Sequence, residues 1–151
     1  MGADVANIAA LSYPKVIDEV IHEDFEAAET FEDFLAAVKR RIQIKCDEIT
    51  ENVKDLWFVP SPFMKVIMSV DDIGVGGKYN NFGVHGTGIA TGADSLAAIK
   101  KYVYDQKKFT RAQLVKAVDE DFANDSDMLA VLRYEAPKMG QNDDEADKLG
   151  C

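Results

Sequence analysis

Glycine, histidine and small polar residues concentrate in one stretch of this 151-residue chain, GVHGTGIATG at residues 83–92. Its four glycines precede a predicted helix, a setting in which backbone N–H groups can bind phosphate. The spacing fits neither common template, because the third glycine of a dinucleotide fingerprint comes one residue late and no Lys-Ser/Thr pair follows. Glycines also permit positive φ and the close approach of another backbone or a ligand. The stretch therefore favours an active-site wall over a nucleotide site.

The chain contains two histidines, His22 and His85. His85, flanked by glycines, is either a structural donor to a nearby carbonyl or a functional group, and its place on a predicted loop favours the second role. His22, in VIHEDFE, is predicted to face solvent without a role.

The remaining reactive side chains form no recognisable constellation. The aspartate pairs at 71–72 and 143–144 lack the spacing of a calcium loop, so we expect caps and surface charges. Cys46 lies on a predicted apolar helical stripe and is expected to be a buried small hydrophobe, whereas Cys151 is the last residue. No Gly-x-Ser-x-Gly elbow is present, and neither cysteine has a histidine nearby in sequence.

The N-terminal part of the chain is predicted to be helical. Residues 5–24 suggest a short helix, a break near Pro14 and a second helix. A longer helix follows, with Thr30 as N-cap and Asp33 in capping-box position. Its apolar residues recur at spacings of three and four, which gives one apolar face: Phe31, Phe34, Leu35, Val38, Ile42, Cys46 and Ile49. The prolines at 60 and 62 should end this helix.

One strand is predicted, at residues 63–70, because FMKVIMSV is short, β-branched and bounded by prolines and glycines. Residues 74–92 are predicted to be an ordered glycine-rich loop. A lone strand cannot satisfy its own backbone. The strand therefore suggests that this chain is a piece of something larger.

Three further helices are predicted after the loop, at 93–105, 110–122 and 127–137. Thr91 or Asp94 should cap the first, and a capping box of Thr110 and Gln113 should open the second. Pro137 should end the third, and a polar, acidic tail follows. The fold class is thus mostly α with a short β element, and we find no linker that would split residues 1–151 into domains.

The composition excludes several classes of partner. A formal charge of −10 opposes non-specific nucleic-acid binding and binding to an anionic membrane surface. Basic runs such as KRR at 39–41 lie on predicted helices and are expected to be solvated faces. No apolar run approaches the ~20 residues of a membrane span, and the N-terminus has no leader pattern, so we expect a cytoplasmic protein.

Several blocks of this sequence together resemble the glycyl radical enzymes, the family of pyruvate formate-lyase. The segment KYNNFGVHGTGIATGADSLAAIKKYVYD carries the strongest likeness. VPSPFMKVIM resembles the family's preceding strand segment, KKFTRAQLVKAVDEDF its following helix, and APKMGQNDDEADKL its Ala-Pro-Lys-x-Gly-Asn-Asp stretch. The likeness covers roughly residues 30–149 in the family's order. The amino-acid sequence of the loop is more similar to the arylacetate decarboxylase branch.

The resemblance implies a fold and a chemistry. The fold would be a piece of a ten-stranded α/β barrel with its surrounding helices. In the family, an activating enzyme that uses S-adenosylmethionine and an iron–sulfur cluster installs a radical on a backbone glycine. The radical passes to a cysteine, which abstracts hydrogen from substrate inside a dry barrel. The implied partners are the rest of such an enzyme or a homo-oligomer, and the activating enzyme; no cofactor would bind this segment directly.

The resemblance also implies roles for polar residues of the loop. Asn80, Asn81, His85 and Thr87 would face the substrate chamber or brace its wall. The glycines that allow close approach there would be Gly83, Gly86 and Gly88.

The chain departs from the family pattern at the residues that carry the radical. No Arg-Val-x-Gly-Tyr motif is present, so none of the ten glycines matches the radical glycine. Neither Cys46 nor Cys151 matches the loop cysteine, and complete members are several times longer. Two functions follow as alternatives: a lyase or decarboxylase segment that is inactive alone, or a non-catalytic helical binding or assembly module derived from the family.

Overall fold

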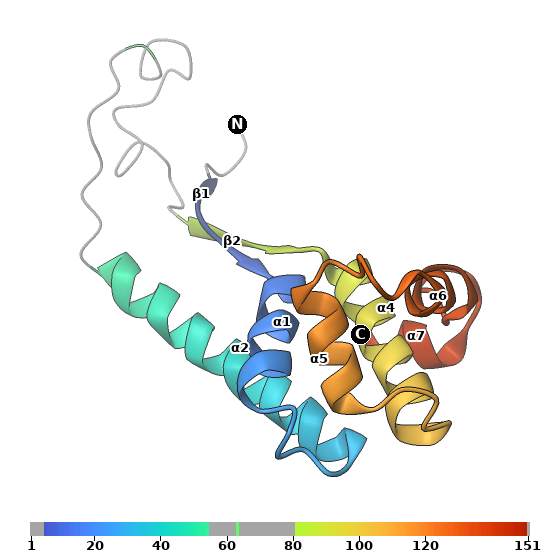
Figure 1. Cartoon of the computed structure of the whole chain (residues 1–151). Helices are drawn as coiled ribbons and strands as arrows, with labels where there is room; N and C mark the ends of the chain where they lie inside the picture. The colour runs from blue at the N-terminus through green and yellow to red at the C-terminus, as the bar shows by residue number, and fades with distance from the viewer. Residues whose placement is uncertain (1–4, 55–62, 64–80, 151) are drawn as a thin grey trace. The chain divides into compact units, whose positions relative to one another are not determined.

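The computed structural model describes residues 5–54, 63 and 81–150 (Figure 1). The chain forms two compact units, one of Met1–Leu11 and Ile44–Gly86 and the other of Ser12–Gln43 and Thr87–Cys151. The predicted strand at 63–70, apart from Phe63, lies outside the described residues, as do Asn80 and Cys151.

The smaller unit contains a two-stranded sheet, in which β1 (Val5–Ser12) pairs with β2 (Asn81–Thr87). Two predictions are wrong here. Residues 5–12 were expected to be helical and residues 81–87 to be a loop, but both segments are strands. Each strand pairs with the other along one edge, and this long-range pairing overrides the local preference of both segments. The mostly helical class with a short β element is confirmed.

Helix α1 (Tyr13–Glu23) begins directly after β1 and carries Pro14 in its first turn, where a missing N–H costs no hydrogen bond. Its apolar side chains fall on one face, as the sequence predicts. The buried ones are Val16, Ile17, Val20 and Ile21.

Helix α2 (Phe31–Lys54) begins at the predicted capping box. The Asp33 N–H donates to Thr30 Oγ1 at 3.1 Å, and the Thr30 N–H donates to Asp33 Oδ2 at 3.1 Å. The predicted apolar stripe is buried only in its first part, and Cys46 is exposed. The prediction of a buried Cys46 is wrong, because Cys46 belongs to the smaller unit, where its side chain is exposed.

Ion pairs join α2 to α1. Arg41, whose side chain is only 19% exposed, reaches Glu23 at 2.5 Å, Asp24 at 3.3 Å and Glu19 at 3.5 Å. These carboxylates raise the pKa of Arg41, chiefly through the hydrogen bond to Glu23. The basic run at 39–41 was predicted to be solvated, but Arg41 forms ion pairs that join the two helices. Arg40 is exposed and pairs with Asp24.

The C-terminal half of the larger unit is a succession of short helices (Figure 1). Two of them are π-helical turns that directly continue an α-helix, a departure found often at functional sites. The elements are α4 (Ile89–Ile99), η1 (Lys100–Asp105), α5 (Arg111–Asp119), α6 (Ser126–Ala130), η2 (Val131–Glu135) and α7 (Asp144–Leu149).

The predicted ends of these helices are partly right. The capping box of Thr110 and Gln113 is confirmed at the start of α5. Ala136, before Pro137, is extended with φ −71° and ψ 150°, so the predicted stop is confirmed. The expected caps Thr91 and Asp94 are wrong, because α4 begins earlier, with Gly88 at its N-cap. Helix α7 lies in the tail that was expected to be polar and acidic, a segment for which no helix was predicted.

Aromatic side chains fill the centre of the larger unit. Phe25 and Phe34 are fully buried, with ring centroids 4.9 Å apart, and Tyr104 packs edge-on to Phe25 at 6.0 Å. The Tyr104 hydroxyl donates to the Ala28 carbonyl at 3.0 Å, and Arg111 donates to the same carbonyl. Burial raises the pKa of Tyr104. The turn between α1 and α2 is thereby fixed by groups from η1 and α5.

Candidate functional site

The glycine-rich stretch forms the passage from β2 into α4. Gly88, the N-cap of α4, has φ 71° and ψ 31°, in the left-handed region. A Cβ at this position would lie 2.8 Å from both Cγ and Cδ of Pro14. Side chains rarely adopt this φ, and no side chain fits against the proline ring. Gly88 is therefore required twice, by its conformation and by its neighbour.

Gly92, one turn into α4, allows the close contact between α4 and α1. A Cβ there would lie 3.1 Å from Tyr13 Cβ and 3.5 Å from Ile17 Cδ1. Gly92 itself is buried. The glycines at the start of α4 thus serve helix packing, a role that the sequence did not distinguish from close approach of a ligand.

Of the predicted wall residues, Asn81, His85 and Thr87 lie in β2. His85 and Thr87 are exposed and two residues apart, the spacing at which strand side chains point to the same face. Gly83 is half-buried and Gly86 exposed in the same strand, and Asn81 begins it. Their role at a substrate chamber remains a prediction.

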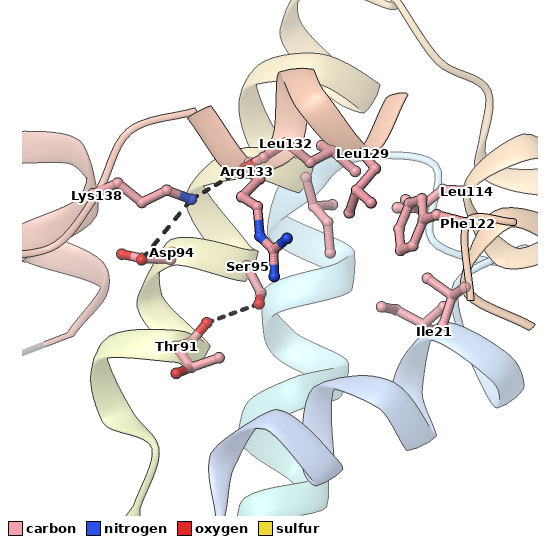
Figure 2. A pocket seen from close by; sticks show the side chains of 13 residues that line it. Ile21, Thr91, Asp94, Ser95, Leu114, Phe122, Leu129, Leu132, Arg133 and Lys138 are labelled. Carbon is pink, nitrogen blue, oxygen red and sulfur yellow. Dashed lines mark hydrogen bonds and ion pairs between the residues drawn. The ribbon is translucent and has the colours of Figure 1, made fainter. Parts of the chain in front are cut away.

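A cavity of about 440 Å³ lies within the larger unit, between α1, α4, α5 and the α6–η2 segment (Figure 2). One side is apolar and is formed chiefly by Ile21, Leu114, Phe122, Leu129 and Leu132. Polar side chains gather at the other side, from α4, η2 and the segment after it. They are Thr91, Asp94, Ser95, Arg133 and Lys138.

Most polar groups of this cavity already have partners. Asp94 accepts a hydrogen bond from the Met139 N–H at 2.7 Å and lies 3.9 Å from Lys138 Nζ. Lys138 also donates to the Leu132 carbonyl at 3.1 Å. The Ser95 hydroxyl donates to the Thr91 carbonyl at 2.7 Å. Asp94 therefore anchors the chain after η2 to α4, instead of capping α4 as the sequence suggested.

A second cavity, of about 620 Å³, lies between α1 and α5 and is lined mainly by charged side chains. His22 joins the two helices there: Nε2 lies 2.8 Å from Asp119 Oδ1 and Nδ1 lies 2.7 Å from the Asp18 carbonyl oxygen. These hydrogen bonds raise the pKa of His22, the one to Asp18 most strongly. His22 is exposed as predicted, but it has a structural role that the sequence did not reveal.

The structure offers no metal centre within residues 5–54 and 81–150. No group of three or more His, Cys, Asp or Glu side chains there could hold an ion. Asp143 instead caps α7 by accepting from the Glu145 N–H at 3.0 Å, in agreement with the expected capping role. Among the helices described, none combines the length and apolarity of a membrane span.

Sequence reasoning missed the cavity of Figure 2 because its parts are distant along the chain. Arg133 and Lys138 fall in a predicted helix end and a predicted tail, with no motif that joins them to Ser95. The one local signal is the Ala-Pro-Lys run at 136–138, which ends a helix and places a lysine directly after it.

The chain is similar in sequence to known proteins. A family profile described as pyruvate formate lyase-like matches residues 14–151. The trans-4-hydroxy-L-proline dehydratase of Clostridioides difficile is 34% identical over an alignment of 135 residues, and the match covers 80% of this chain and 17% of that protein. The isethionate sulfite-lyase of Desulfovibrio desulfuricans is 46% identical over 63 residues, 42% of this chain and 8% of that protein.

A solved structure agrees with these sequence matches. The crystal structure of hydroxyproline dehydratase from Clostridioides difficile, with trans-4-hydroxy-L-proline bound, matches with a TM-score of 0.67 and 26% identity. The match covers 97% of this chain and 22% of that chain. The matched region is thus about a sixth of the length of the first curated relatives. On the profile match across residues 14–151 and these relatives, the chain belongs to the pyruvate formate lyase-like family of glycyl radical enzymes.

Proposed function

We propose that this chain is a segment of a glycyl radical lyase or dehydratase that shapes the enzyme without carrying its reactive residues. The family match over residues 14–151 carries this proposal. The relatives reported above are named as a dehydratase and a sulfite-lyase, so carbon–heteroatom bond cleavage is the reaction class that they support. The arylacetate decarboxylase branch stays a prediction.

The proposed contribution of the segment is a barrel strand at 63–70 and a stretch of the substrate-chamber wall along β2. The exposed side chains of His85 and Thr87, on one face of β2, would supply hydrogen-bonding groups to that wall. Asn80 and Asn81 would extend it. The left-handed Gly88 would end the wall by turning the chain into α4.

The radical chemistry would come from outside this segment. The family's radical supplies hydrogen abstraction, and an activating enzyme with S-adenosylmethionine and an iron–sulfur cluster installs it. None of the ten glycines lies in an Arg-Val-x-Gly-Tyr context, and Cys46 is exposed on α2 rather than placed on a chamber loop. The residues present therefore do not fit a radical store or a hydrogen-abstracting thiol. We expect the chain alone to be inactive.

Electron paramagnetic resonance tests this proposal. The chain is incubated without oxygen with a glycyl radical activating enzyme, S-adenosylmethionine and a reductant. The expected result is no glycyl radical signal, while the full-length trans-4-hydroxy-L-proline dehydratase with its own activating enzyme gives one as a positive control. A glycine-centred signal from this chain alone would contradict the proposal.

A second candidate is a helical binding or assembly module that keeps the family sequence without its chemistry. The buried core of the larger unit favours it, because Val20, Phe25 and Phe34 are fully enclosed by residues of the described chain. A unit with such a core can fold without further domains. The two candidates predict different behaviour of the chain in solution.

A further inference from the structure

The cavity of Figure 2 has a positively charged side within an acidic protein. Its lining includes two cationic side chains, Arg133 and Lys138, and one carboxylate, Asp94. Asp94 lies 3.9 Å from Lys138 Nζ and accepts a hydrogen bond from the Met139 N–H. The carboxylate is therefore engaged by groups other than Arg133, and the cavity retains one net positive charge. Such a local potential attracts an anion even when the whole chain carries −10.

The Arg133 guanidinium is the cation available to a ligand. Within residues 5–54 and 81–150, no ion pair or hydrogen bond involves it, and Figure 2 shows it beside Ser95, facing the space between α4 and the apolar side chains. Arginine presents N–H groups in a planar fork that matches a carboxylate. It is held on η2, the π-helical turn that ends at Glu135.

The opposite side of the cavity is suited to hydrocarbon. Ile21 and Leu114 are buried with 8% and 4% exposure, and the partly buried Phe122 and Leu129 complete this side. The volume of about 440 Å³ falls within the range of small-molecule sites, which combine apolar walls with a few polar groups that fix orientation.

We propose that this cavity binds a small organic acid with an apolar body, its carboxylate on Arg133 and its hydrocarbon among Ile21, Leu114 and Leu129. The cavity lining includes no residue of β2, and binding at this site does not rest on the proposed enzyme role. It assigns a ligand class, a medium-chain or ring-bearing monocarboxylate, to a place where the sequence showed no motif.

Binding of octanoate to the full 151-residue chain tests the proposal. Nuclear magnetic resonance titration, followed through methyl signals, should show saturable shifts at Ile21, Leu114 and Leu129. Two probes of the same chain length separate charge from hydrophobicity: octanol, which is neutral, and octylammonium, which is positive. Both should bind at least about tenfold more weakly than octanoate, the loss expected for one charge-assisted hydrogen-bonded pair.

Two variants of equal charge change locate the carboxylate. Arg133→Gln should weaken octanoate binding about tenfold and bring it to the affinity of octanol. Lys148→Gln removes the same charge from α7, outside the cavity lining, and should change the affinity less than about twofold. The methyl spectrum without ligand shows whether each variant keeps the native packing.

Three results would overturn the proposal. They are octanol binding as tightly as octanoate, equal affinities of Arg133→Gln and the unmodified chain, and no saturable shift at the three methyl positions up to millimolar octanoate.

Discussion

Gly88 shows how one residue can be fixed by both its conformation and its neighbour. Its φ is 71°, and an added Cβ would meet Pro14 at 2.8 Å. Gly140 has a similar φ of 81°, yet an added Cβ there would meet no atom within 4 Å. The two glycines therefore separate the cost of the left-handed conformation from the cost of the steric clash.

The substitutions Gly88→Ala and Gly140→Ala should differ in their effect on stability. We expect Gly140→Ala to lower the free energy of unfolding by about 1 kcal/mol, the cost of the left-handed region alone. Gly88→Ala should lower it by about 2–4 kcal/mol, because overlap with the proline ring adds to that cost. Urea denaturation followed by circular dichroism measures both, and equal losses would show that Pro14 moves aside freely.

His22 should make stability depend on pH. Its two ring nitrogens each face an oxygen, on Asp119 and on the backbone of Asp18, and only the protonated ring can donate to both. The pKa of His22 in the folded state is accordingly raised above its ordinary value of 6.5. The contribution to stability is then fully present below about pH 6.5 and is lost as the pH rises through the folded pKa.

The variant His22→Gln should remove this dependence. We subtract the free energy of unfolding of the variant from that of the unmodified chain. This difference should be larger at about pH 5.5 than at about pH 8. Asp33 acts in the opposite sense, because its pKa is lowered and its contribution to stability is lost as the pH falls. Asp33 is present in both the unmodified chain and the variant, so its contribution cancels in the difference. A difference that does not change with pH would mean that His22 is not charged in the bridge.

At the scale of single elements, helix α5 depends on its capping box. Thr110→Ala removes the hydroxyl that accepts from the Gln113 N–H and should lower the free energy of unfolding by about 0.5–2 kcal/mol. Thr110→Ser keeps the hydroxyl and serves as the matched control. Amide hydrogen exchange should show the loss of protection first at the start of α5. Equal protection in both variants would argue that packing, not capping, fixes this helix end.

The elements also show what the sequence could predict and what it could not. Both capping boxes, at Thr30 and Thr110, were predicted because their hydrogen bonds span only three residues. The β1–β2 pair was not, because each strand requires a partner many residues away. The same holds for the cavity beside Arg133, whose polar and apolar sides come from separate helices. The sequence therefore predicted hydrogen bonds between nearby residues, but not contacts between residues that are distant along the chain.

At the scale of the whole molecule, the two proposed functions predict different behaviour in solution. An independent module should unfold in one cooperative transition and run at the mass of a monomer or dimer. A segment that needs the rest of an enzyme should aggregate through unpaired strand edges. Thermal denaturation and light scattering coupled to size-exclusion chromatography measure both properties. A cooperative transition would favour the independent module, which would be held together by the enclosed aromatic core of the larger unit, and aggregation would favour the enzyme segment.

The shared carbonyl of Ala28 has a consequence for how the protein is made. Its two donors, Tyr104 and Arg111, are encoded far downstream, with Arg111 83 residues away. Because the ribosome delivers the N-terminal part first, α1 and α2 emerge long before the groups that lock the turn between them. During synthesis, the turn between α1 and α2 therefore lacks both of these donors until residue 111 has been added.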